Sequence, residues 1–595
     1  MKHTLIVRTL MLMLPCLASS SLALAQATEE WVAIYDSPGS DDDEAYAMTV
    51  DAAGNVYVGG YSTDLIGYDQ MHTVKYNADG VEQWSATHAG TDDDDDYVSA
   101  IAVDASGNVY VTGTANNTGT SSDLCTLMYD ANGIEQWVAN YSGPGSLSDS
   151  ANDIAVDGSG NVFVTGYVRT SSGTDWDCVT IMYDASGTEQ WVNAFDGTGN
   201  DQDYATALVV DGSSNVFVTG TTTNAAGNRD GLTIMYDSTG AQQWLNVYNG
   251  IFNGSDRIRG ITLDGLGNVV VTGSTEIAPN DHACLTIQYN SSGGEQWTTI
   301  YNGVEGEGAG GSCITSDGLG NTYVGGYSDS LVTGRDFCTI KYDSNGVSQW
   351  VATYDGPANG HENVSAIALD GLGNVYVTGE VDTQSTDLDW ATVMYDPLGV
   401  EQWSVAYDGG IGDFDRPNAL AVDGSGNVFV AGISYDATGY VNFVTVKYAV
   451  ANSYIGTMYG TAVKNSTGVV SSIFGSGDLV AANNAFGLVA TGLPNGEFGY
   501  FIGSFGQAQV NMPGGSNGNL CVGGGQAIAR FLPTLGVIAG GQISGAVDLT
   551  NVPLPPTMTG MILGGDTFNF QLWHREGGSL SGESNFTPGL EVTFQ

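Results

Sequence analysis

Tryptophan recurs along most of the chain at a nearly constant interval, and this repetition constrains the fold more than any other feature of the sequence. The interval is 53 or 54 residues, and seven of the eight tryptophans follow a glutamine. They are Trp31, Trp84, Trp137, Trp191, Trp244, Trp297, Trp350 and Trp403. A fixed period of this length is typical of architectures in which each unit completes its core against the next unit.

A second marker, D-x-x-G-N, repeats in step with the tryptophans and keeps its glycine in every copy but one, where Ser214 stands. The copies start at Asp51, Asp104, Asp157, Asp211, Asp264, Asp317, Asp370 and Asp423. Asp side chains bond turn amides, and Gly and Asn tolerate positive φ. Each marker therefore predicts a tight turn between two strands.

Each unit holds four short runs with the pattern of β-strands. In the second unit these are SAIAVD at 99–104, NVYVTG at 108–113, CTLMYD at 125–130 and EQWVANY at 135–141. Alternating apolar residues, β-branched and aromatic side chains, and Gly- or Asn-containing turns all favour strands. Four strands in a radially repeated unit indicate a β-propeller blade, with the tryptophan packed against the neighbouring blade.

The two ends of the repeat array predict the number of blades and how the ring closes. Trp31 lies in a strand-like run, WVAIYD, that has no blade before it, and the last unit lacks a Gln-Trp strand of its own. The N-terminal strand therefore completes the last sheet. We predict an all-β fold, with an eight-bladed β-propeller over residues 29–450 that is closed by an N-terminal strand.

The recurring core AIAVDASGNVYVTG, found at 100–113 and with small changes in the other units, resembles the bacterial SBBP-type β-propeller repeat. That repeat occurs in secreted and surface proteins. The resemblance covers roughly residues 29–450 and implies a propeller and an exported location. It implies no activity, because propellers host many functions.

The segments outside the repeats predict an exported protein with a second domain. Residues 1–25 have a basic start, an apolar stretch and a small-residue Ala-Leu-Ala ending, as in a cleaved signal peptide. No other segment indicates a membrane-spanning helix. Residues 453–595 contain alternating runs separated by Gly- and Pro-rich turns, which favours a β-sandwich. This region resembles C-terminal modules of other secreted bacterial proteins.

The charge is strongly negative. The formal net charge is −52, and loss of Lys2 and Arg8 with the signal peptide makes it −54. Such a field repels nucleic acid and anionic membranes and favours cations or cationic ligands. The expected partners are therefore cations and an unidentified extracellular protein or glycan.

Two series of acidic residues recur at fixed places in the repeat. The first stands eight residues before each turn Asp, and only Ala309 interrupts it: Asp43, Asp96, Asp149, Asp203, Asp256, Glu362 and Asp415. The second precedes the third strand: Asp123, Asp177, Asp230, Asp336 and Asp389. The loops that carry both series emerge on one propeller face, so we predict an acidic rim there. Paired carboxylates suit Ca²⁺, whereas an Asp that holds a turn is the alternative explanation.

The sequence gives little support for an enzyme. The histidines share no repeat position, and no nucleophile, zinc-protease or phosphate-loop motif is present. Cys125, Cys178, Cys284 and Cys338 precede the T-[IL]-x-Y segment of different repeats and are expected to be buried thiols rather than a zinc site. The leading hypothesis is therefore an exported, non-catalytic binding or surface scaffold.

Two enzymatic alternatives stay open. A hydrolase acting on carbohydrate or another polymer would use paired carboxylates. A quinoprotein-type dehydrogenase is suggested by the Y-D-x-x-G-x-x-Q-W segments, which loosely resemble its tryptophan-docking motif. The adjacent Cys pair of that class is missing here.

Overall fold

The computed structural model describes residues 27–450, with gaps at 38–40, 93, 171–174, 200, 305, 359, 383–387, 410–413 and 437–438, and the strands of the C-terminal region. The predicted signal peptide lies outside the described residues. Every regular element in the described part of the chain is a β-strand. No helix there is long and apolar enough to cross a membrane.

Residues 27–450 form eight four-stranded antiparallel sheets, and this confirms the predicted eight-bladed propeller. The first four sheets are β2 (Asp43–Val50), β3 (Val56–Thr63), β4 (Asp69–Tyr76), β5 (Glu82–His88); β6 (Tyr97–Val103), β7 (Val109–Asn116), β8 (Ser122–Tyr129), β9 (Glu135–Tyr141); β10 (Ser150–Val156), β11 (Val162–Arg169), β12 (Trp176–Tyr183), β13 (Glu189–Phe195); and β14 (Tyr204–Val210), β15 (Val216–Thr223), β16 (Arg229–Tyr236), β17 (Gln242–Tyr248). The other four are β18 (Arg257–Leu263), β19 (Val269–Ala278), β20 (Asp281–Tyr289), β21 (Glu295–Tyr301); β22 (Ala309–Ser316), β23 (Thr322–Ser330), β24 (Gly334–Tyr342), β25 (Ser348–Tyr354); β26 (Asn363–Leu369), β27 (Val375–Asp382), β28 (Leu388–Tyr395), β29 (Glu401–Tyr407); and β30 (Arg416–Val422), β31 (Val428–Tyr435), β32 (Val441–Val450), β1 (Ala27–Tyr35).

The D-x-x-G-N marker forms the turn between the first and second strand of each blade. In the second blade, Asp104 Oδ1 accepts hydrogen bonds from the backbone amides of Ser106 and Asn108, at 2.8 and 2.9 Å. The Asn108 side chain donates to the other carboxylate oxygen at 2.8 Å. Gly107 adopts φ +81°, a conformation that favours glycine. The marker is therefore explained by the geometry of the turn.

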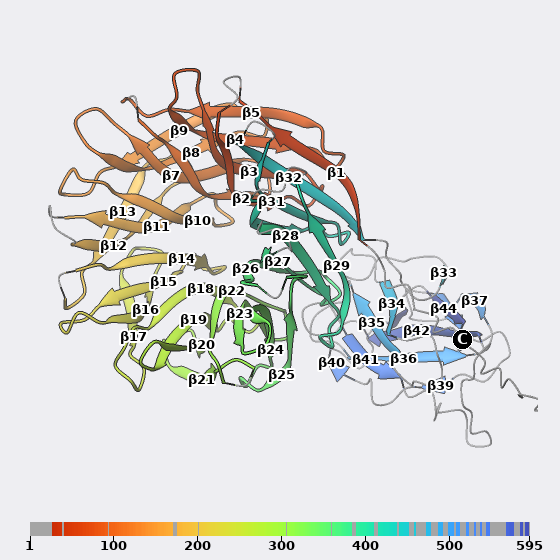
Figure 1. The fold of residues 1–595 in the computed structure, drawn as a ribbon. Coiled ribbons are helices and arrows are strands. Elements are labelled where there is room, and N and C mark those ends of the chain that lie inside the picture. The colour runs from red at the N-terminus through yellow and green to blue at the C-terminus, as the bar shows by residue number, and fades with distance from the viewer. Residues whose placement is uncertain are drawn as a thin grey trace, which may run out of the picture.

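The first strand of every blade is the innermost, and neighbouring first strands contact one another around the whole ring, from β2 and β6 through β26 and β30 and back to β2. Figure 1 shows the sheets arranged around this shared axis. Successive antiparallel strands reverse direction. The loops between the second and third strands therefore emerge on the same face as the loops that enter the next blade. We call this side the loop face.

The last blade combines both ends of the repeat array. β1 pairs antiparallel with β32, with Val32 opposite Val446 and Ile34 opposite Val444. The Lys447 ammonium lies 2.8 Å from the Glu30 carboxylate of β1. Residues more than 400 positions apart therefore share one sheet.

The repeated tryptophans join each blade to the next. The Trp84 indole donates to the carbonyl of Ala131 at 3.2 Å, and its ring lies against Gly133, where an added Cβ would approach to 2.5 Å. The same indole bond is made by Trp31, Trp191, Trp244, Trp297 and Trp350 to residues 47 positions later. Seven of the tryptophans are only partly buried, and Trp403 is fully buried. They contribute contacts between blades as well as hydrophobic burial.

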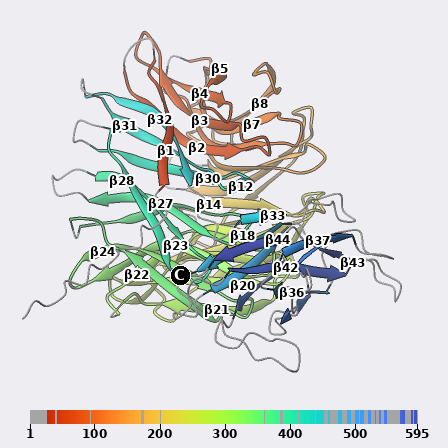
Figure 2. The same cartoon turned by 90° about the vertical axis from the view of Figure 1, so that its right-hand side faces the viewer.

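The strands of the C-terminal region are β33 (Thr457–Tyr459), β34 (Ser472–Gly477), β35 (Phe486–Thr491), β36 (Phe498–Ser504), β37 (Gln507–Asn511), β38 (Asn519–Val522), β39 (Ala529–Arg530), β40 (Gly536–Val537), β41 (Ile543–Val547), β42 (Thr567–Arg575), β43 (Ser584–Phe586) and β44 (Gly589–Thr593). β36, β42 and β44 lie side by side in one sheet (Figure 2). β34, β35 and β41 form another. The side chains of residues 451–595 lie outside the described part, so a β-sandwich there stays a prediction.

Candidate functional site

The first acidic series lies where each innermost strand begins, and all seven of its side chains are buried. Asp96 is typical of the series. Its Oδ2 accepts a hydrogen bond from the amide of Gly90 at 2.5 Å, and its Oδ1 accepts one from the amide of Asn116 at 2.6 Å. The first amide belongs to the loop that enters the blade, and the second ends β7. The carboxylate therefore ties two loop-face segments together.

The same pair of bonds recurs in four other blades, to amides six residues before and twenty residues after the acid. The acceptors are Asp43, Asp149, Asp203 and Asp256. Asp415 accepts from Gly409 at 2.6 Å, and Glu362 makes a longer bond of 3.3 Å to Gly360. Burial raises the pKa of Asp96, while the amide bonds favour its charged form.

The aspartate run at 92–96 is explained by this arrangement. Asp96 is the buried member that binds the two amides, whereas Asp92, Asp94 and Asp95 are exposed. Asp95 Oδ1 accepts from the amide of Asp69 at 3.2 Å. One position of the run is thus part of the blade, and its neighbours add negative charge to the loop face.

The second acidic series stands at the start of the third strand, and its members are also nearly buried. Asp123 accepts hydrogen bonds from Thr120 Oγ1 at 2.7 Å and from Asn117 Nδ2 at 3.2 Å. One buried carboxylate oxygen has no hydrogen-bond donor in each of Asp123, Asp177 and Asp336. An ionised oxygen without a donor is costly to bury. In the first series only Glu362 has such an oxygen, its Oε2.

A third acidic position completes the site, and the sequence analysis missed it. Asp196, Asp355 and Asp408 follow the tryptophan strand, each five residues after its tryptophan. Asp36 is their counterpart in the last blade, and the remaining blades have Ala89, Ser142, Asn249 and Asn302 there. The constant spacing from tryptophan was visible in the sequence.

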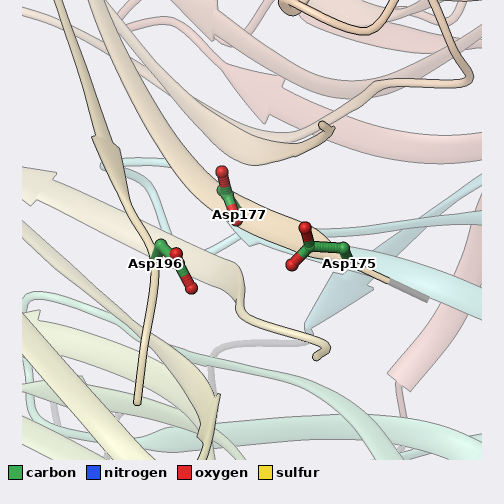
Figure 3. A group of neighbouring side chains, drawn as sticks. All are labelled: Asp175, Asp177 and Asp196. Carbon is green, nitrogen blue, oxygen red and sulfur yellow. The ribbon is translucent and has the colours of Figure 1, made fainter. Parts of the chain in front are cut away.

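The structure brings members of these series together at three places, one of which also includes Asp175, a residue outside all three series. In each group, one carboxylate oxygen per residue lies within 4.8 Å of the others. The groups are Asp175, Asp177 and Asp196; Asp336, Asp355 and Glu362; and Asp389, Asp408 and Asp415. Figure 3 shows the first group, with Asp175 and Asp177 at the beginning of β12 and Asp196 on the chain that leaves β13.

The second and third groups span two blades. Asp336 of β24 and Asp355 after β25 belong to one blade, and Glu362 immediately precedes β26 of the next. Both predicted acidic series therefore contribute to these two junctions. Among the described residues, the other predicted acids form no such group of three.

Two members of these groups, Glu362 and Asp177, have clearly raised pKa values. Burial, with the neighbouring charges of Asp355 and Asp336, raises the pKa of Glu362 to about 7. Burial, with the charges of Asp196 and Asp175, raises the pKa of Asp177 to about 6. A positive charge placed among these groups would favour their ionised forms.

None of the described histidines belongs to one of these acidic groups. His88 lies 3.1 Å from Glu135, on the fourth strands of adjacent blades. His72 is buried between Tyr35 of β1, with ring centroids 4.1 Å apart, and Phe443 of β32. Neither ring nitrogen of His72 has a hydrogen-bond partner. Burial lowers its pKa to about 4.

The five described cysteines, Cys125, Cys178, Cys284, Cys313 and Cys338, all have free thiols. Four of them are buried, as expected for small apolar side chains, and Cys313 is partly buried.

A protein-family model described as "Beta-propeller repeat" (SBBP) matches residues 83–119 and 136–167. No curated protein matches the chain. Among solved structures, the β-propeller domain of the Trilobed protease from Pyrococcus furiosus is 11% identical with a TM-score of 0.36, over 59% of this chain and 93% of that chain. The acylaminoacyl peptidase of Pyrococcus horikoshii is 9% identical with a TM-score of 0.34, over 64% of this chain and 58% of that one. Likeness at this level assigns no activity to this chain. The repeat matches and the eight blades together support an SBBP-type β-propeller.

Proposed function

We propose that this protein is an exported, non-catalytic binding scaffold whose loop face recognises an extracellular protein or glycan. The observation that carries the proposal is the composition of that face. It combines a dense negative charge with large apolar side chains at the tips of blade-specific loops, while the blades beneath are nearly uniform. A repeated frame with variable loops is a common arrangement for binding sites.

The apolar tips come from different blades. Leu65 and Ile66 lie between β3 and β4, at 77% and 70% exposure, and Leu331 and Val332 hold the same place between β23 and β24, at 74% and 82%. Exposed apolar side chains rimmed by polar groups are typical of interaction surfaces. Leu65 and Ile66 also line a cavity of about 450 Å³ together with Tyr35.

The net negative charge of the chain makes polyanions unfavourable ligands. With 66 acidic and 14 basic residues, the chain repels polyanions and attracts cationic surfaces at long range. A basic protein or a neutral glycan therefore fits this face better than nucleic acid.

The test is binding without turnover. The chain would be incubated with chitin, cellulose, peptidoglycan and lysozyme as a basic protein, and both retention and product release would be measured. We expect retention on at least one of them and no release. The variant L65S/I66S/L331S/V332S should bind at least tenfold more weakly, whereas the control I134S/L398S, in exposed turns of the opposite face, should bind like the wild type. Equal binding by both variants would contradict the proposal.

One observation favours the hydrolase alternative. Glu362, with a pKa near 7 beside Asp336 and Asp355, has the protonation behaviour of a general acid next to carboxylates. Against it, Glu362 is fully buried and Asp336 nearly so, which leaves little access for a polymer. Release of sugar or peptide by the wild type that disappears in E362Q would establish the hydrolase and reject the scaffold.

We also propose that β1 closes the ring, that residues 453–595 fold as a β-sandwich, and that residues 1–25 direct export. The pairing of β1 with β32 supports the closure. Deletion of residues 27–35 should lower the melting temperature, and a synthetic peptide of that sequence should restore it. A mature N-terminus near Gln26 in the exported protein would support the signal peptide, and a cytoplasmic full-length chain would contradict it.

A further inference from the structure

A group of three carboxylates lies at the junction between two blades. Asp336 begins the third strand of one blade, Asp355 follows the tryptophan strand of that blade, and Glu362 precedes the first strand of the next. One oxygen of each lies within 4.8 Å of the others. Three separate chain segments therefore bring their charges to one point.

Two of the three side chains contribute buried oxygens that have no donor. Asp336 Oδ2 accepts from Thr333 Oγ1 at 2.8 Å, and Glu362 Oε1 accepts from the amide of Gly360 at 3.3 Å. Their other oxygens, Asp336 Oδ1 and Glu362 Oε2, are buried with no hydrogen-bond partner. Asp336 is 7% exposed and Glu362 is fully buried. Buried carboxylate oxygens normally have a donor or a metal ion.

No cationic side chain in the described part of the chain forms an ion pair with the group. Arg335 is adjacent in sequence, but its guanidinium binds Asp329 at 2.8 Å and lies over the ring of Tyr327. Among the ion pairs of the described residues, none includes a member of the group. The negative charge of the group therefore has no ion-pair partner among the residues that the structure describes.

We propose that Asp336, Asp355 and Glu362 bind a divalent cation, with Ca²⁺ preferred, that links these two blades. The three oxygens lie within 4.8 Å of one another, close enough for one cation to contact all three after small side-chain adjustments. Ca²⁺ accepts irregular coordination by several carboxylate oxygens, whereas Mg²⁺ requires near-octahedral geometry and releases its waters reluctantly. A site built from three carboxylates on three separate segments therefore suits Ca²⁺ better than Mg²⁺. The exposed carboxylate of Asp355 gives the ion a path from solvent.

The geometry recurs one blade further on, with Asp389, Asp408 and Asp415 in the same three repeat positions. The junction at Asp230 and Asp256 has Asn249 in the third position, and Asp230 accepts two bonds from Asn224. That junction supplies a matched control from the same chain. The cation site does not depend on which ligand the loop face binds.

The experiment uses the full chain, freed of metal with chelator, and isothermal titration with CaCl2 and, separately, MgCl2. We expect Ca²⁺ to bind at least tenfold more tightly than Mg²⁺ and to raise the melting temperature. The key variant is D355N, because this exposed side chain can change without disturbing the blade. It should reduce the number of bound Ca²⁺ ions by one, as should E362Q.

The control D230N should keep the wild-type stoichiometry and affinity. Three results would overturn the site: Ca²⁺ and Mg²⁺ acting alike, D355N and E362Q both retaining every ion, or D230N losing an ion as they do. Circular dichroism of each variant before titration separates loss of the ion from loss of the fold.

Discussion

Replacement of His72 by valine should make the propeller more resistant to acid. His72 is the only residue of its kind at this repeat position, where the other blades have Cys125, Val179, Leu232, Leu285, Cys338, Ala391 and Val444. Its ring is buried against Tyr35, and its nitrogens have no partners. Burial alone lowers its pKa from 6.5 to about 4, so the folded state keeps the ring neutral.

The size of the effect follows from the two pKa values. Above pH 6.5 the ring is neutral in both the folded and the unfolded chain, and its titration costs nothing. As the pH falls toward 4, His72 binds a proton in the unfolded state but stays neutral in the folded state. The free energy of unfolding therefore drops by about 2 kcal/mol at pH 5 and by about 3 kcal/mol at the acid limit. The valine variant escapes this loss.

Thermal unfolding at pH 7.5 and at pH 5 measures the difference. An unfolding entropy of about 0.9 kcal/mol/K for some 420 residues converts about 2 kcal/mol into about 2 °C. The advantage of H72V over the wild type should grow by that amount between the two pH values. The variant C125V, at the equivalent position one blade later, should differ from the wild type equally at both. If the advantage of H72V is the same at pH 7.5 and pH 5, His72 does not titrate as argued and only its packing matters.

Two further substitutions test the repeated contacts. G133A should lower the free energy of unfolding by about 2–4 kcal/mol, because its Cβ would meet the Trp84 ring at 2.5 Å and its φ is +79°. The control G119A, at φ +96° with open space around it, should lower it by only about 1 kcal/mol. Equal melting temperatures of the two variants would show that the contact with the ring contributes nothing to stability. D96N should lower the free energy of unfolding, measured with urea, by about 1–3 kcal/mol, because an amide nitrogen replaces one of the two acceptor oxygens. The control D94N, at an exposed position, should change it by less than about 0.5 kcal/mol. A D96N protein as stable as D94N would contradict the role of the buried carboxylate.

The fold was predictable because its signals are local and repeated. The tryptophan spacing and the turn Asp set the strands of each blade, and the unpaired Trp31 strand predicted that the N-terminal strand completes the last sheet. The residues that the tryptophans contact in the next blade could not be predicted from the sequence. The carbonyl of Ala131 and the surface of Gly133 are ordinary turn atoms in the sequence, and they become partners only when two blades are placed side by side.

The sequence predicted the acidic positions but not how their carboxylates are hydrogen-bonded. Asp96 and Asp336 both recur at fixed repeat positions, so both were assigned to one rim. The structure distinguishes them, because two amides occupy the oxygens of Asp96 whereas one oxygen of Asp336 has no donor. Which donors reach each carboxylate oxygen depends on the conformation of loops that vary in length and composition. Asp355 was missed because only four of the eight blades have an acidic residue at its position.

The pairing of the first strand with the last one has a kinetic consequence. β1 is synthesised first, but its partner β32 follows about 400 residues later. At translation rates of about 5–20 residues per second, the strand waits roughly 20–80 s before its edge can pair. An unpaired edge invites association with other chains during that time. Glu29 and Glu30, both exposed in β1, place two negative charges on this unpaired strand. Their repulsion of a like strand from another chain opposes intermolecular pairing before β32 is synthesised.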